Sequence, residues 1–126
     1  TEKPEAGPDF FLLGVWSQPA YSFDKWVERG INTVVRHESL SGTVSASDWS
    51  AEAREDGLYY IRQPRGDGSS DVNDSRLLAW MHEDEPDSHG TAPSVLQANY
   101  ARLKGIDPTR PVAIRLMVVP LLSAAE

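Results

Sequence analysis

The chain has 126 residues, 40% of them hydrophobic and 25% charged, which is the composition of one globular domain rather than of a disordered or fibrous chain. Nineteen acidic residues against twelve basic ones give a net charge of -7, so the phosphates of nucleic acid or of an anionic membrane would repel the chain. The chain contains no cysteine, which excludes disulfides, thiolate metal sites and a cysteine nucleophile.

The chain begins with a polar segment, residues 1–9, which we expect to be flexible. No basic stretch followed by an apolar one is visible there, so no signal peptide is predicted and the cellular location stays open. The longest apolar stretches, residues 10–16 and 116–122, are far shorter than the ~20 residues of a membrane-spanning helix. We therefore expect a single domain over residues 10–126 and no membrane partner.

The first part of this domain is predicted to alternate strand and helix. Residues 10–16 form a near-continuous apolar run, which is typical of a strand covered on both faces. Ser22 can cap a short helix over residues 23–29, and Gly30 can end it. Residues 31–37 are β-branched and apolar until two polar residues close the run, which predicts a second strand.

The middle of the chain repeats this order. Residues 47–57 begin with a capping residue and end in glycine, which predicts a second helix. A third strand is predicted over residues 58–64, and residues 65–74 are rich in Gly, Ser and Asp, as surface loops are. Residues 77–82 then predict a fourth strand. Any helix between the third and fourth strands must be short.

The last predicted elements complete an α/β pattern. A helix is expected from Pro93 to Gly105, because Leu96, Tyr100 and Leu103 recur on one stripe. Residues 112–119 predict a fifth strand. Strands that alternate with helices pair in parallel through right-handed crossovers, so the sequence predicts about five parallel strands with alternating helices.

Polar residues gather where the predicted strands end, at the carboxyl edge of the sheet that carries the site in parallel α/β folds. Trp16 also lies at this edge and offers an aromatic face on which a sugar ring can stack. Four of the residues, Arg36, His37, Arg62 and Gln63, have two open roles, since they can bind substrate or pair with the acidic cluster that follows the fourth strand. The candidate substrate-binding residues are Trp16, Gln18, Arg36, His37, Arg62, Gln63 and His82.

The strongest motif is the end of the fourth predicted strand, Trp80-Met81-His82-Glu83-Asp84-Glu85-Pro86. Hydrolysis of a glycoside needs a carboxylic acid that can protonate the leaving oxygen. Crowding among like charges raises the pKa of a carboxyl group toward that task. The adjacent carboxylates therefore make Glu85 and Asp84 the candidate catalytic residues.

This motif, together with Trp16-Ser17-Gln18-Pro19 and Arg62-Gln63-Pro64, resembles the N-terminal half of glycosidase-like (β/α)8 (TIM) barrels. In the large clan of retaining glycosidases an Asn-Glu-Pro motif ends the fourth strand, and its Glu is the general acid/base. The resemblance implies a half barrel that acts on or binds carbohydrate. It implies that Glu85 is the acid/base and that Asp84 stands in the place of the Asn.

The sequence departs from that family in two ways. Asp84 cannot donate a hydrogen bond as Asn does unless it is protonated. The family's nucleophile, a Glu after the seventh strand, has no counterpart here, although the retaining mechanism needs two carboxyl groups ~5 Å apart. Whether the chain is an enzyme is therefore open, and the alternatives are a noncatalytic carbohydrate-binding module and a structural half-barrel remnant.

An open half barrel would leave two strand edges and an apolar sheet face uncovered, so we expect a homodimer. We expect no cofactor. His82, Glu83, Asp84, Glu85, Asp87 and His89 are potential metal ligands. Their spacing does not form a His-Glu-x-x-His pattern, because Pro86 occupies the place of the second His, and no metal site is predicted.

Overall fold

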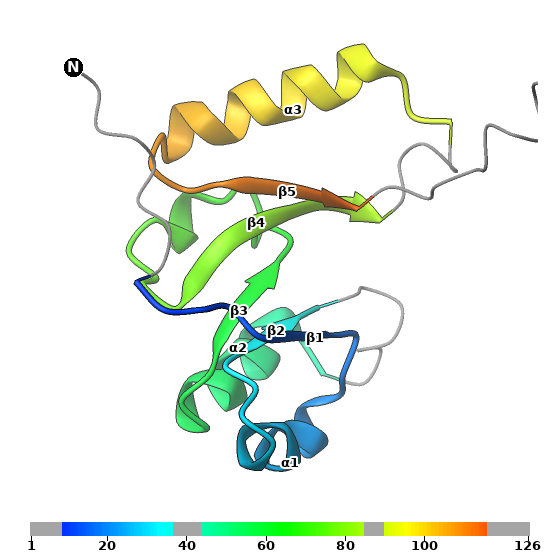
Figure 1. Ribbon diagram of the computed structural model, residues 1–126. Helices are drawn as coiled ribbons and strands as arrows, with labels where there is room; N and C mark the ends of the chain where they lie inside the picture. The colour runs from blue at the N-terminus through cyan, green and yellow to red at the C-terminus, as the bar shows by residue number, and fades with distance from the viewer. Residues whose placement is uncertain (1–8, 37–43, 85–89, 116–126) are drawn as a thin grey trace, which may run out of the picture.

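The computed structural model describes residues 9–36, 44–84 and 90–115. Strands and helices alternate along the chain (Figure 1), with one short 3-10 helix, η1, before the first α-helix and another, η2, between the third and fourth strands. The elements are β1 (Gly14–Trp16), η1 (Ala20–Ser22), α1 (Phe23–Glu28), β2 (Thr33–Val35), α2 (Ala46–Glu55), β3 (Tyr59–Arg62), η2 (Ser69–Asp71), β4 (Leu77–Asp84), α3 (Pro93–Ile106) and β5 (Val112–Arg115).

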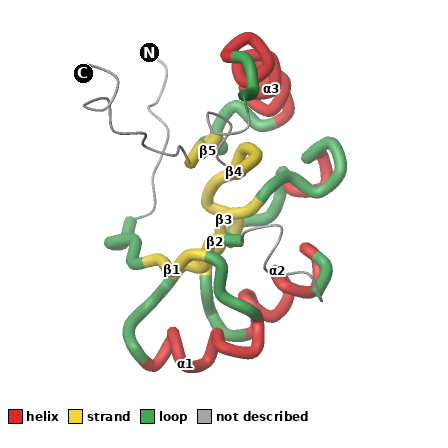
Figure 2. Tube along the Cα trace, turned by 90° about the vertical axis from the view of Figure 1, so that its right-hand side faces the viewer, coloured by secondary structure: helices red, strands yellow, loops and turns green. Residues whose placement is uncertain are grey.

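The five strands form one sheet in the order β1-β2-β3-β4-β5, and every neighbouring pair is parallel. Figure 2 shows the strands following an arc, with the three α-helices on its outer side. The predicted α/β class is therefore confirmed, and the curved parallel sheet is consistent with part of a barrel. None of the helices in the described segments combines the length and apolarity that crossing a membrane requires.

The strand register divides the side chains between the two faces of the sheet. Val34 and Tyr60 are paired neighbours, and both belong to the buried core under the helices. Because side chains alternate along a strand, the next paired residues, Val35 and Ile61, take the opposite, inner face. The buried core consists of Phe23, Val34, Trp49, Ala53, Leu58, Tyr60, Leu77, Trp80 and Leu103.

The first strand is shorter than the apolar run predicted, and its buried character was predicted wrongly. Phe11 is 81% exposed, and Leu12 and Leu13 are exposed as well. The side chain of Asn32 holds this stretch beside the second strand, since it accepts from the backbone N–H of Leu13 at 3.0 Å and donates to the carbonyl of Phe11 at 2.8 Å. This run lies beside the edge strand β1, where fewer neighbouring elements shield apolar side chains from water.

Helices α1 and α3 begin at Phe23 and Pro93, as expected, whereas α2 begins at Ala46, one residue before its predicted span. The N-cap of α2 is Ser45, whose Oγ accepts from the backbone N–H of Asp48 at 3.1 Å. Ser22 precedes α1 but makes no side-chain cap, because its hydroxyl donates to the carbonyl of Pro19. Helix α3 ends at Ile106, one residue beyond Gly105.

The third connection is short, as predicted, with the 3-10 helix η2 in place of an α-helix. Strand β4 runs two residues further than expected, to Asp84. Strand β5 is described as far as Arg115, and the remainder of its predicted span, residues 116–119, lies outside the described residues.

Candidate functional site

The carboxyl end of β1 presents Trp16. Its register partners are Val35 of β2 and, through that strand, Ile61 of β3, so it shares the inner face of the arc with them. The preceding residue, Val15, packs instead against the core on the helix side. This register places Trp16 on the face opposite the helices, at the edge where the sequence predicts a site. Its side chain is partly buried.

The turn after β1 is fixed by three hydrogen bonds. The backbone N–H of Ser17 donates to the carbonyl of Val35 at 2.8 Å. The side-chain amide of Gln18 donates back to the carbonyl of Trp16 at 3.1 Å, and the indole of Trp49 donates to the carbonyl of Gln18 at 3.3 Å. Gln18, a predicted substrate residue, therefore also has a structural task.

Arg36 lies just beyond the carboxyl end of β2, and its Nη2 donates to the carbonyl of Val44 at 3.1 Å. This contact ties the end of β2 to the segment that enters α2. His37, the other candidate here, lies outside the described residues.

Arg62, at the end of β3, turns toward the helices and is 1% exposed. Its Nε donates to the hydroxyl of Ser50 on α2 at 2.8 Å, and its Nη1 donates to the carbonyl of Gln63 at 2.9 Å. Nη1 and Nη2 also donate to the two carboxylate oxygens of Asp71 at 3.2 and 2.9 Å. Of the two roles open to Arg62, these contacts support the structural one, with Asp71 as its partner.

Asp71 is the centre of the loop between β3 and β4. Burial of its carboxylate opposes the charge, but hydrogen bonds from the side chain of Arg62, the backbone N–H of Arg65 and the indole of Trp80 outweigh it. Together they hold the pKa of Asp71 well below its usual range. The loop is thus anchored by a buried, ionised carboxylate.

Gln63 and His82, two predicted substrate residues, line one pocket of 350 Å³ at the carboxyl ends of β3 and β4. Asn99 and Arg102 of α3 complete its polar lining, and Pro64, Gly66, Met81 and Val95 are its other members. Arg102 donates to the side-chain oxygen of Asn99 at 2.9 Å and, through Nη1, to the carbonyl of Asp67 at 2.9 Å. The guanidinium is thereby held between the β3–β4 loop and the helix.

The sequence did not indicate Asn99 and Arg102. Their only local signal is their spacing of three residues, which puts them on one helix face with Val95. That spacing is equally typical of a solvated helix face. The contact of this face with the β3–β4 loop, which brings Asp67 to Arg102 across 35 residues of sequence, is what makes them part of a pocket.

The two predicted catalytic residues lie at the limit of what the structure describes. Asp84 is the last residue of β4, and its backbone is in register with Arg115 of β5. Glu85 follows it directly and lies outside the described residues. Among the described residues there is no group of three or more His, Asp or Glu side chains that could hold a metal ion.

Comparison of the chain with models of protein families, with curated proteins and with solved structures finds no match.

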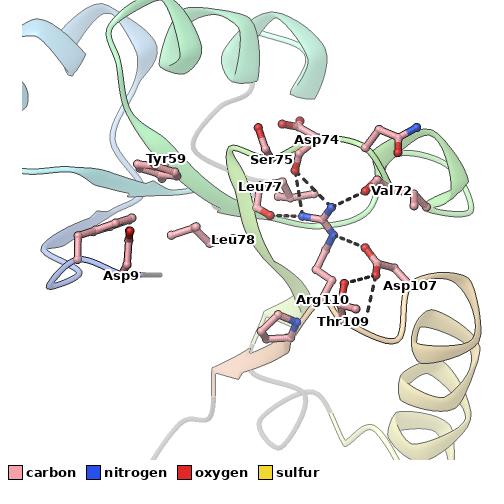
Figure 3. A pocket seen from close by; sticks show the side chains of 13 residues that line it. Asp9, Tyr59, Val72, Asp74, Ser75, Leu77, Leu78, Asp107, Thr109 and Arg110 are labelled. Atoms are coloured by element: carbon pink, nitrogen blue, oxygen red, sulfur yellow. Dashed lines mark hydrogen bonds and ion pairs between the residues drawn. The ribbon is translucent and has the colours of Figure 1, made fainter. Parts of the chain in front are cut away.

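A larger cavity, of 490 Å³, lies at the opposite, amino-terminal edge of the sheet (Figure 3). Arg110 crosses it, donating to the carboxylate of Asp107 at 3.2 Å and to backbone carbonyls that include those of Leu77, Val72 and Asp74. These bonds tie the start of β5 to the β3–β4 loop. At this edge of a parallel barrel such residues serve stability, and we assign this cavity no catalytic part.

Proposed function

We propose that this chain acts on or binds carbohydrate at the carboxyl edge of its sheet, as a glycoside-hydrolase-like protein with Glu85 as general acid/base. The observation that carries the proposal is the pocket shared by Gln63 and His82. It lies at the end of β4, and Glu85 is the residue that directly follows β4 in the sequence.

The lining of this pocket suits a sugar. The amides of Gln63 and Asn99 each offer a donor and an acceptor, as a ligand rich in hydroxyl groups requires. Pro64, Met81 and Val95 add apolar surface for the C–H faces of a sugar ring. A compact site that combines apolar lining with a few polar groups is the usual form of a small-molecule site.

In the proposed reaction the carboxylic acid of Glu85 protonates the oxygen of the leaving group. The neighbouring carboxyl group of Asp84 would favour the protonated form of Glu85 through like-charge repulsion. The reaction also needs a second carboxylate, to act as nucleophile or to activate water. A second copy of the chain would bring a second acidic cluster into the same assembly.

The test is the substitution Glu85→Gln, which keeps the shape of the side chain and removes the acid. On a panel of aryl glycosides and oligosaccharides we expect hydrolysis to fall by about 10²- to 10⁴-fold, the usual contribution of a general acid. Glu83→Gln, two residues earlier in the same motif, is the matched control and should retain turnover.

Unchanged hydrolysis in Glu85→Gln would refute the assignment of the acid. Wild-type chain that hydrolyses no member of the panel, but whose tryptophan fluorescence is quenched by one of the sugars, would support a noncatalytic carbohydrate-binding module instead. Neither hydrolysis nor quenching would refute the carbohydrate proposal as a whole.

A second candidate is a structural half barrel that homodimerises. It is favoured by apolar surface at both ends of the sheet. At the β1 end Phe11, Leu12 and Leu13 are exposed. At the β5 end an apolar groove of 420 Å³ is lined by His82, Leu96, Gln97, Tyr100, Ala101, Val112 and Ile114. A monomer exposes both surfaces to water, whereas association of two half barrels would cover them.

A further inference from the structure

Ser17, directly after β1, has an unusual backbone. Its φ of 56° makes it the one non-glycine residue with positive φ in the described segments. This left-handed conformation is unfavourable for a residue with a Cβ atom. Ser17 lies between two candidate ligand residues, Trp16 and Gln18, at the edge of the sheet that carries the proposed site.

The surroundings of Ser17 impose this conformation. Its own N–H is bonded to Val35 of the next strand, and the carbonyls on either side of it, those of Trp16 and Gln18, accept from the Gln18 amide and the Trp49 indole. Strained residues persist where their neighbours determine them in this way, and such residues cluster at ligand-binding sites. These bonds fix the turn, and none of them involves the side chain of Ser17.

The hydroxyl of Ser17 is buried and has no hydrogen-bond partner among the residues that the structure describes. A polar atom that is withdrawn from water without a partner is unfavourable and uncommon in native proteins. A rotation about χ1, the single bond that carries the hydroxyl, re-aims it without moving the fixed backbone. A strained backbone and an unsatisfied hydroxyl therefore coincide in one residue, at the carboxyl edge of the sheet.

We infer that Ser17 is a substrate-positioning residue whose hydroxyl bonds to a sugar hydroxyl at the β1 end of the site, an inference that rests on the proposed carbohydrate function. Adjacent strands lie ~4.8 Å apart, so the end of β1 is about 10 Å from the end of β3, where Gln63 lines the pocket. A ligand that reaches both is an oligosaccharide that crosses β1, β2 and β3, rather than a single sugar.

Two substitutions separate this role from a structural one. Ser17→Gly removes both the hydroxyl and the backbone strain, so we expect Tm to rise by a few degrees. Ser17→Ala removes the hydroxyl alone, and Tm should not fall, because that hydroxyl forms no hydrogen bond with the described residues. In both variants we expect the Kd for an oligosaccharide to increase about tenfold, as for the loss of one hydrogen bond.

Binding is measured by tryptophan fluorescence with cello-, xylo-, laminari- and chito-oligosaccharides. The exposed Ser94 of α3 supplies the control, Ser94→Ala, whose Kd should equal that of the wild type. If Ser17→Ala binds as tightly as the wild type, or if its Tm falls by several degrees, the inference is overturned while the carbohydrate function stands. If the wild type itself binds none of these oligosaccharides, the proposed function fails and the inference fails with it.

Discussion

Arg62 and Asp71 form an ion pair whose side chains are 1% and 0% exposed, at the end of β3 and in the loop that follows it. Arg65 and Trp80 bond to the same carboxylate, so three side chains, from the loop and two strands, depend on the charge of Asp71. A pair of this kind does not add much stability relative to apolar residues, but the loss of one member leaves the other charge buried and uncompensated.

We therefore expect Asp71→Asn to lower the free energy of unfolding by about 3–5 kcal/mol, measured by chemical denaturation. Asp67→Asn, in the same loop but exposed, is the control and should change it little. The pKa of Asp71 is lowered in the fold, so its stabilising effect is present above the ordinary carboxylate value of 3.8 and is lost as the pH falls below it. The variant should lack this part of the acid dependence. Equal stability of the two variants would contradict the assignment.

At the level of single residues, the sequence predicted the polar character of the strand ends but not which side chains meet. Arg62 was a candidate for substrate or structure, and the sequence did not indicate its structural partner, Asp71, nine residues later in a loop without periodicity. Gln63 and His82 were indicated by the ends of the predicted strands in which they lie. Arg102 was not indicated, because its place in the pocket depends on its contact with Asp67 of the β3–β4 loop, 35 residues earlier in the sequence.

Helix α2 shows what local sequence determines about an element and what it leaves open. The run of helix formers and the glycine that follows predict the helix and its end. Both Ser45 and Ser47 are suitable caps, and the backbone places Ser45 at the N-cap. Ser47 instead accepts a hydrogen bond from Arg65 at 3.0 Å. The choice between the two depends on the path of the chain before the helix.

We expect Ser45→Ala to lower the free energy of unfolding by about 1 kcal/mol, because the backbone N–H of Asp48 loses its acceptor. The matched variant Ser47→Ala removes an exposed contact and should cost less than about 0.5 kcal/mol. Thermal unfolding of the two variants under the same conditions provides the comparison. A larger loss in Ser47→Ala than in Ser45→Ala would contradict the observed cap.

For the whole molecule, the apolar surfaces at the two ends of the sheet lead to a prediction about mass in solution. Light scattering across a dilution series should give a dimer for the wild type. Phe11→Ser and Leu12→Ser, at the β1 end, should shift the equilibrium toward monomer. Val72→Ser, an exposed apolar residue in the central β3–β4 loop, is the control and should leave the mass unchanged. A wild type that is monomeric at all concentrations would overturn the dimer.

The sequence by itself determined the parallel α/β class, the order of the elements and the edge of the sheet where polar side chains collect. These follow from local properties, because hydrophobic periodicity, capping residues and glycines act within a few residues of the chain. Tertiary structure alone decided that Phe11 to Leu13 are exposed, that Arg62 pairs with Asp71 and that Gln63 and His82 share a pocket with Arg102. Each of these features depends on contacts between segments that are distant in sequence, or on the position of a segment at the edge of the sheet. A local sequence pattern specifies neither.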